Sequence, residues 1–312
     1  SNKTNYNFNY SLFYNRFFLD NLNSTTANVT VVPNVSGWTA KFNYTVILND
    51  PEADNVTCVL FTSTNGGSSY ANKGNTTVNG GIGSCSVIVN NFQASDIGTD
   101  NFFKFQIVNG EPANTFNTSA FEGPNLTVSN VTITLVTGNA GNINRSASSI
   151  PLMVFVNDTS NSSVAQNVNV TFWVSTNITA LDNITVNVTN GTGQAAYYFN
   201  PTCSFVAAQQ VWKAGVTDGN YNATNTSNFS VTVLGDMILN ISRPLGVEIL
   251  LGNNVSLNGS IIDDCNVNIT DGAVAFRSVH NETNNYCTNI VNLGVGNYSC
   301  TVNTTGMEPG WY

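Results

Sequence analysis

The chain has 312 residues, enough for two or three domains of ordinary size, and 41% of them are hydrophobic, enough to fill packed cores. Only 9% are charged, against roughly 25% in typical soluble domains. A net charge of −9 with nine basic residues argues against nucleic acid and bare anionic membranes as partners. The longest apolar run, 150–156, is too short for a membrane helix and predicts a strand. Because no signal peptide is evident, we expect a mature form or an internal fragment.

The N-terminal segment, residues 1–23, contains a strictly alternating stretch at 5–12. Its aromatic residues Tyr6, Phe8 and Tyr10 are separated by asparagines, which predicts a half-buried strand ahead of the first domain. This strand could pair within its own chain, could be donated to the open sheet edge of a neighbouring subunit, or could remain disordered. The sequence leaves these three alternatives open.

The rest of the chain consists of short alternating runs separated by Gly, Asn, Asp and Pro, a pattern typical of β-sandwiches. The same order of strands recurs three times at a spacing of roughly 100 residues, which is an internal repeat. It divides the chain into domain 1 (24–128), domain 2 (129–235) and domain 3 (236–312), the last incomplete at its C-terminal end. Linkers are nearly absent, so we expect stiff junctions. The expected strands are 41–48, 55–62, 85–92 and 101–108 in domain 1; 150–158, 167–175, 183–189, 193–200, 209–216 and 227–234 in domain 2; and 254–263, 272–279, 286–293 and 296–304 in domain 3.

Four stretches carry a resemblance to a known family: "DPEADNV" at 50–56, "ASDIGTDNFFKFQIVNG" at 94–110, "WKAGVTDGNYNATNTSNFSVTV" at 212–233 and "GNYSCTVNTTGMEPGWY" at 296–312. They resemble the immunoglobulin-like repeats of large archaeal surface glycoproteins of filament, surface-layer or adhesin type. The resemblance covers most of residues 26–312. It implies an all-β fold of three tandem immunoglobulin-like β-sandwiches with an extra N-terminal strand. It specifies function poorly, because such repeats occur in all three classes of protein.

The acceptor pattern for N-glycosylation, Asn-x-Ser/Thr, is unusually frequent. The chain has 53 Asn, 36 Thr and 27 Ser, and random placement would give about 11 such sequons, whereas 29 are present. This excess favours a chain that is exported and glycosylated, and sugars would supply the solvation that the missing charges do not. The predicted glycosylation sites are Asn28, Asn34, Asn55, Asn75, Asn130, Asn157, Asn169, Asn177, Asn183, Asn187, Asn190, Asn222, Asn225, Asn240, Asn258, Asn268, Asn281 and Asn297.

A sequon has the same period of two as a β-strand, so one short pattern can specify both a strand and its decoration. In "NITVNVT" at 183–189, the alternation predicts that Ile184, Val186 and Val188 fill the sandwich interior while the asparagines face water. The same phase is expected in the runs that begin at Asn28, Asn130, Asn169 and Asn228.

The chain has six cysteines, and an even number in an exported, sequon-rich chain predicts three disulfides. No CxxC motif or Cys/His cluster indicates zinc. The predicted pairs are Cys58–Cys85 within domain 1, Cys287–Cys300 across a hairpin of domain 3, and Cys203–Cys265 across the junction of domains 2 and 3. The last pair would act as a covalent staple that keeps this joint from bending.

Calcium is the one cofactor that the sequence brings forward. "NDPEADN" places Asp50, Glu52 and Asp54 at alternate positions of a turn, where their carboxylates could converge on one ion. An ordinary acidic turn is the alternative interpretation. The pair Asp263 and Asp264 is a weaker candidate of the same kind.

The sequence offers little support for catalysis. Its only histidine, His280, is expected in a solvated loop, with no base and nucleophile arranged around it. Of the four tryptophans, Trp173 and Trp212 lie in strand patterns, so we expect them in cores, whereas Trp38 and Trp311 could serve in carbohydrate stacking.

Together these features predict a structural, heavily N-glycosylated, extracellular protein at a cell surface that is not an enzyme. Our first choice is a filament subunit that self-associates head to tail, with strand donation as one way to form a contact that does not close on itself. The alternatives are an adhesin or glycan-binding module, and a surface-layer component or the stalk of a larger surface protein. Apart from glycans and the candidate calcium we expect no cofactor, and no direct membrane insertion of this segment.

Overall fold

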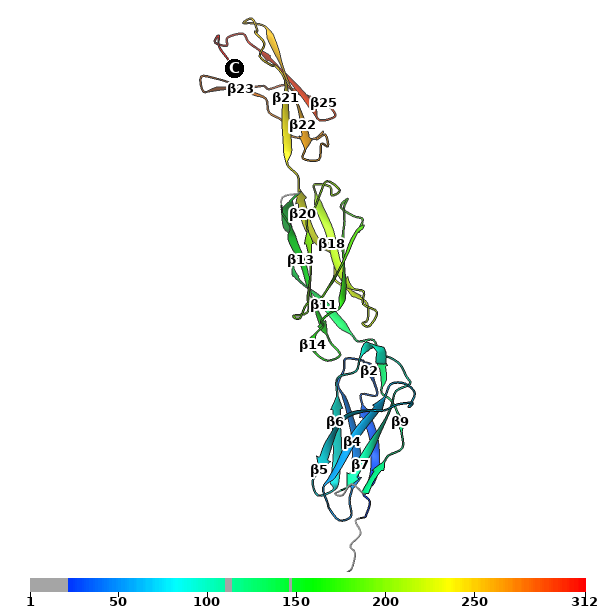
Figure 1. The fold of residues 1–312 in the computed structure, drawn as a ribbon. Coiled ribbons are helices and arrows are strands. Elements are labelled where there is room, and N and C mark those ends of the chain that lie inside the picture. Colours follow the sequence, from blue (N-terminus) through cyan, green and yellow to red (C-terminus); the bar gives the residue numbers. More distant parts are fainter. Residues whose placement is uncertain (1–21, 110–113, 146–147) are drawn as a thin grey trace, which may run out of the picture. The chain divides into compact units, whose positions relative to one another are not determined.

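The computed structural model describes residues 22–109, 114–145 and 148–312, and its secondary structure is almost entirely β (Figure 1). The one helical element in these ranges is a short 3-10 turn, η1 (Ala94–Asp96). No helix among the described residues is long and apolar enough to cross a membrane. The strand predicted at 5–12 lies outside the described residues.

The chain divides into two compact units. The first contains the described residues up to Asn130 together with Asp158–Ser162, and the second contains Val131–Asn157 and Ser163–Tyr312. Three separate clusters of buried hydrophobic residues are present among the described residues, one within each of the ranges named domain 1, domain 2 and domain 3. The second unit therefore holds two cores.

Domain 1 is an immunoglobulin-like sandwich. One sheet has the order β1-β3-β6 and the other the order β5-β4-β7-β8, with β9 beside β8 on β7. The strand β3 reads FNYTVILN and buries every second residue, from Phe42 to Leu48, because a period of two sends alternate side chains to opposite faces. The strands are β1 (Thr25–Val32), β2 (Val35–Gly37), β3 (Phe42–Asn49), β4 (Val56–Ser63), β5 (Ala71–Val78), β6 (Ile82–Val89), β7 (Phe102–Asn109), β8 (Thr115–Asn117), β9 (Phe121–Glu122) and β10 (Asn125–Thr127).

Domain 2 repeats this plan with a larger second sheet. β13 lies between β11 and the strands β14 and β17, while the facing sheet has the order β12-β20-β18-β15-β16. In both domains the short strand after the first long strand runs parallel to the last one, as β2 does to β10 and β12 to β20. The strands are β11 (Val131–Thr137), β12 (Gly141–Asn144), β13 (Ile150–Asp158), β14 (Ser163–Val164), β15 (Asn169–Val174), β16 (Asn183–Val188), β17 (Gln194–Phe199), β18 (Gln209–Val216), β19 (Thr224–Asn225) and β20 (Phe229–Leu234).

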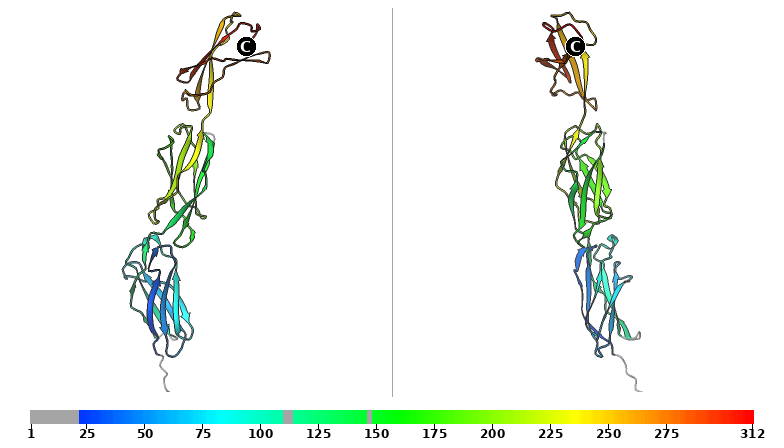
Figure 2. Two further views of the ribbon diagram at one scale, coloured as in Figure 1. Left: turned by 180° about the vertical axis from the view of Figure 1, so that it is seen from behind. Right: turned by 90° about the vertical axis from the view of Figure 1, so that its left-hand side faces the viewer.

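Domain 3 has one four-stranded sheet of order β21-β22-β26-β25 and, facing it, a hairpin of β23 and β24 (Figure 2). The hairpin occupies the place of the six-stranded sheet of domain 2. The strands are β21 (Met237–Arg243), β22 (Asn254–Asp263), β23 (Arg277–His280), β24 (Thr283–Tyr286), β25 (Ile290–Gly294) and β26 (Asn297–Asn303).

The strand β16 forms where the sequence predicts it, but with the opposite face inward. Ile184, Val186 and Val188 are 59%, 58% and 47% exposed, so the prediction that they fill the interior is wrong. The reason is the register with β15, which places the polar residues of β16 beside the core-facing side chains of its neighbour. The Nδ2 of Asn187 donates to the backbone oxygen of Ala196 in the opposite sheet at 2.6 Å. The four runs that begin at Asn28, Asn130, Asn169 and Asn228 have the expected alternate set of apolar side chains on their inner face.

Candidate functional site

The joint between domains 2 and 3 combines a disulfide with a polar network. Cys203, in the loop after β17, is disulfide-bonded to Cys265, in the turn after β22, with 5.5 Å between their Cα atoms. The other cysteines form Cys58–Cys85, which links the two sheets of domain 1, and Cys287–Cys300 in domain 3. These are the three pairs that the sequence predicts, and no described cysteine is free.

Beside this disulfide lies Arg145, at the end of β12, with a side chain only 3% exposed. Its Nη2 donates to Asp263 Oδ2 at 2.7 Å and lies 3.0 Å from Asp264 Oδ1, and its Nη1 donates to the backbone oxygen of Phe205 at 3.4 Å. A residue of domain 2 thus holds two carboxylates of domain 3. Sequence analysis missed Arg145, because a single basic residue after a short strand carries no pattern.

The charge on Asp263 is stabilised by its surroundings. Burial alone would raise the pKa of this carboxyl, but hydrogen bonds from the backbone N–H groups of Val267 and Cys265 and from Arg145 outweigh it and hold the pKa below its usual range. The ion pair therefore stays formed over the ordinary pH range.

Gly235 makes room for the guanidinium group. A Cβ at this position would lie too close to Arg145 Nη2 and 2.8 Å from Asp264 Oδ1. The glycine that leads from β20 into domain 3 is thus required by packing, since any side chain there would displace the ion pair.

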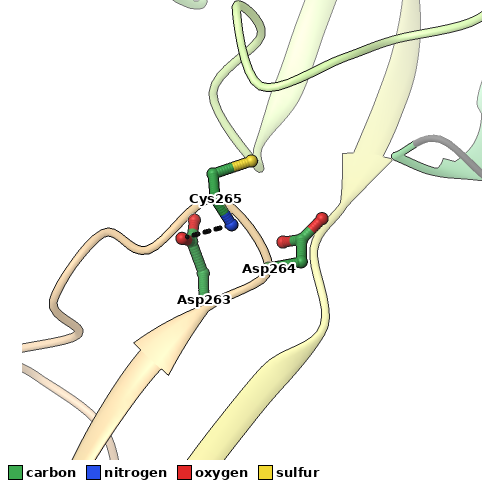
Figure 3. Close-up of side chains that lie close together, drawn as sticks. All are labelled: Asp263, Asp264 and Cys265. Carbon is green, nitrogen blue, oxygen red and sulfur yellow. Dashed lines mark hydrogen bonds between the residues drawn. The ribbon is translucent and has the colours of Figure 1, made fainter.

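The acidic cluster at this joint, Asp263, Asp264 and Cys265, has the proximity of a metal site but not its chemistry (Figure 3). The Cys265 sulfur is bonded to Cys203 and is not a thiolate, and both carboxylates are already paired with the Arg145 guanidinium group. The arrangement acts as a lock between two domains, formed by one covalent bond and one buried ion pair.

The other predicted calcium residues are not brought together among the described residues. Asp50 is buried and its carboxylate accepts hydrogen bonds from Ser24 Oγ, from Asn109 Nδ2 at 2.8 Å and from the backbone N–H of Asp54 at 2.7 Å. Glu52 and the Asp54 side chain are exposed. In this structure the Asp50 carboxylate connects the end of β3 to β7 and to the residues that enter domain 1.

Domain 3 leaves most of its apolar side chains in water. Only four hydrophobic residues are buried in its cluster, against sixteen in domain 1 and eighteen in domain 2. All seven residues of β21 are exposed, and the segment after β21 is equally uncovered. The exposed large apolar residues of these two stretches are Met237, Ile238, Leu239, Ile241, Leu245, Val247, Ile249, Leu250 and Leu251. Exposed apolar areas of this size are typical of interaction sites.

The smaller number of strands in domain 3 explains why these apolar residues are exposed. In domain 2 the short strand β12, which follows the first long strand, pairs with β20 and so belongs to the six-stranded sheet. In domain 3 the corresponding residues are those after β21, and no described strand pairs with them. The β23–β24 hairpin has no neighbour that corresponds to β18, which pairs with β15 in domain 2. Among the described residues this hairpin alone faces the four-stranded sheet of domain 3, so we call domain 3 the open third sandwich.

The eighteen predicted acceptor asparagines differ in exposure, and Asn187 already donates from its Nδ2 to the opposite sheet. None is buried; fifteen are exposed, and Asn157, Asn183 and Asn258 are half-buried. Several cluster on domain 2, including Asn169 and Asn225 on the outer face of its six-stranded sheet.

The predictions for His280 and for Trp173 need correction. His280 is not in a solvated loop but at the end of β23, half-buried, with its ring 4.5 Å from that of Tyr312 and its Nδ1 2.9 Å from the backbone oxygen of Trp311. Trp212 is in the core as expected, whereas Trp173 points outward and lies beneath the Lys213 ammonium group. The cause is again the phase of the alternation, because the side chains of β15 that face the core are Val170, Phe172 and Val174.

Comparison with known proteins gives little beyond the fold. No family model matches the sequence, and no curated protein matches it. Among solved structures, a tetra-tandem repeat from the extending region of a large adhesion protein shares 18% identity over 91% of this chain, with a TM-score of 0.36, and the match covers 66% of that chain. The FN1–FN3 domains of chicken CNTN1 share 9% identity over 91% of this chain and 87% of theirs, with a TM-score of 0.26. A bacterial ice-binding adhesin shares 15% identity over 92% of this chain and 89% of its own, with a TM-score of 0.28. Scores this low give no support to a shared function, and the immunoglobulin-like fold is established by the sheets themselves.

Proposed function

We propose that this chain is a structural, heavily N-glycosylated, extracellular protein, and that it serves as a subunit of a cell-surface filament assembled by strand donation. The observation that carries the filament is the open third sandwich. An immunoglobulin-like module with an uncovered apolar face and a two-stranded second sheet is a ready acceptor for strands from another chain.

The donor in this proposal is the segment at 5–12. Its alternation of aromatic residues and asparagines matches what an open sandwich needs, an apolar face toward the core and a polar face toward water. Donation from the N-terminal end of one subunit to domain 3 of the next is heterologous, so it propagates into a filament instead of closing into a ring.

The extracellular, glycosylated part of the proposal has separate support. Three disulfides favour an oxidising compartment. The excess of sequons, the low charge and the absence of buried sites among the eighteen acceptors favour glycosylation. The locked joint suits a load-bearing role, because force along the chain would act on a disulfide and a buried ion pair.

The test of strand donation adds a synthetic peptide, NYNFNYSL, to the purified chain. We expect the peptide to raise the melting temperature of domain 3 and to slow hydrogen exchange in β21 and in the residues after it, since bound strands stabilise the folded state. The matched control is the same peptide with serine at Tyr6, Phe8 and Tyr10, which should have no effect. Equal results from both peptides would contradict donation and favour completion of domain 3 by other residues, as in a stalk. Peptide mapping by mass spectrometry tests the glycans independently.

A further inference from the structure

The outer face of the six-stranded sheet of domain 2 carries an exposed aliphatic stripe that the proposed filament contact does not use. The stripe consists of Ile184, Val186 and Val188 on the edge strand β16, and no described strand pairs with the outer edge of β16. An exposed apolar edge strand of this kind is an aggregation hazard that natural proteins cover or guard.

The register shows what stands next to the stripe. Ile184 is paired with Trp173, which is itself paired with Lys213 and lies 5.2 Å from its ammonium nitrogen. In an antiparallel sheet paired residues share one face, so the Trp173 ring extends the stripe across β15. The apolar surface therefore includes one residue of β15, at the end of the stripe where Ile184 lies.

Two acceptor asparagines stand on the same face. Val188 is paired with Asn169, the exposed first residue of a sequon, so this asparagine lies directly beside the stripe. One row along, the side chain of Asn225 lies over Gly215, which has no Cβ to obstruct it. The acceptors and the stripe therefore lie together on one surface.

Domain 1 shows that this face is a special feature of domain 2. Its β5 takes the same edge position beside β4 that β16 takes beside β15. The residues of β5 on the corresponding face are polar: Asn72, Asn75 and Thr77. The fold does not require an aliphatic stripe at this position, so the stripe needs an occupant of its own.

We infer that the occupant is the chain's own N-linked glycan at Asn169, which lies along the sheet over Val188, Val186 and Ile184 and reaches the Trp173 ring. The apolar faces of pyranose rings pack against aliphatic and aromatic side chains, while their hydroxyl groups remain in water. The sugar thereby guards the β16 edge without a protein partner. This inference rests on the proposed glycosylation of the chain.

The test compares four forms of the glycosylated protein: wild type, Asn169→Gln, the triple variant Ile184→Thr, Val186→Thr and Val188→Thr, and their combination. We expect Asn169→Gln to lower the melting temperature of domain 2 by about 2–4 °C, to speed hydrogen exchange in β16 and to increase the binding of an apolar dye. The triple variant should cause a similar drop, and the combination should add little, because both changes remove one contact. The control Asn240→Gln removes a sequon on β21 and should leave β16 exchange unchanged.

Additive losses, or an Asn169→Gln protein with unchanged exchange and dye binding, would overturn the inference. A dimer of the wild-type protein that the triple variant abolishes would overturn it in favour of a second copy as occupant. Mass spectrometry distinguishes a failure of the covered stripe from a failure of the proposed glycosylation. A bare Asn169 with sugar at other sequons refutes only the covered stripe, whereas a chain without sugar at any sequon also refutes the proposed glycoprotein.

Discussion

Domain 2 closes two sheets over eighteen buried hydrophobic residues, whereas domain 3 closes one sheet and a short hairpin over four. The two domains follow the same early order of strands, so the difference lies in the strands available to cover each apolar face. A strand such as β21 can form with all its residues exposed if its backbone pairs with a neighbour. The side chains of such a strand become buried, and contribute most of their stabilisation, only when a second sheet packs against them. Domain 3 therefore depends on its disulfide and on the joint to domain 2.

The largest contrast is expected for core aromatic residues. Trp212 is fully buried, stacks on Phe172 and donates from Nε1 to the backbone oxygen of Gly138 at 2.9 Å. Trp212→Ala should lower the free energy of unfolding of domain 2 by about 3–5 kcal/mol. Tyr298→Ala should cost domain 3 less, because few neighbours are left to lose contacts. Hydrogen exchange read separately in β13 and β22 measures both; equal losses would mean that domain 3 is as well packed as domain 2.

Removal of the inter-domain disulfide should act mainly on domain 3. Cys203 and Cys265 are 62 residues apart, and on the chain-entropy model their bond contributes about 4 kcal/mol. The double change Cys203→Ser and Cys265→Ser should speed exchange in β22 far more than in β13. Removing Cys58–Cys85 by the same substitutions is the matched control and should affect neither strand. Similar losses in β13 and β22 would show that the two domains unfold as one unit.

Much of this architecture follows from residue patterns. The strand succession, the three domain cores and the cysteine pairs are predictable because alternation and the even cysteine count constrain neighbours strongly. The face of an edge strand is not predictable in the same way. In β16 either the aliphatic or the polar set of alternate residues could face inward. The register of β16 with β15, which depends on the turn between them, determines that the polar set does.

The joint illustrates a second limit. The Cys203–Cys265 pair could be deduced from strand directions, but Arg145 and Gly235 could not. Arg145 meets Asp263 across 118 residues of the chain, and Gly235 lies against Asp264, 29 residues away (264 − 235). Neither residue belongs to a recognisable motif. Long-range polar pairs of this kind leave no local periodicity in a single sequence.

The ion pair of the joint should have a smaller effect than the disulfide. Arg145→Gln would leave two partly exposed carboxylates without their cation, which should cost about 1–3 kcal/mol, at the low end for a buried pair because water reaches both aspartates. The effect should depend on pH. Because the folded pKa of Asp263 is lowered, its stabilisation is present above the ordinary aspartate pKa of about 3.9 and is lost as the pH falls through the lower folded value.

Unfolding of wild type and of Arg145→Gln should thus differ most near neutral pH and converge in acid. The matched control is Lys213→Gln. It removes a cation of domain 2 that lies over the outward-facing Trp173 ring and takes no part in the joint. A difference between wild type and Arg145→Gln that persisted unchanged below the aspartate range would assign the effect to lost packing of the arginine stem instead of its charge.

The smallest effect should come from apolar residues that domain 3 leaves uncovered. Leu239 on β21 is 71% exposed, so Leu239→Thr should change the free energy of unfolding of the separate chain by less than about 0.5 kcal/mol. Its counterpart Val154→Thr on β13 places a hydroxyl in a fully buried site and should cost about 1–3 kcal/mol. In the assembled filament the ranking should change, because donated strands would bury Leu239. A Leu239→Thr variant that folds normally as a monomer but assembles poorly would connect the open face of domain 3 directly to polymerisation, whereas normal assembly would separate this face from the subunit contact.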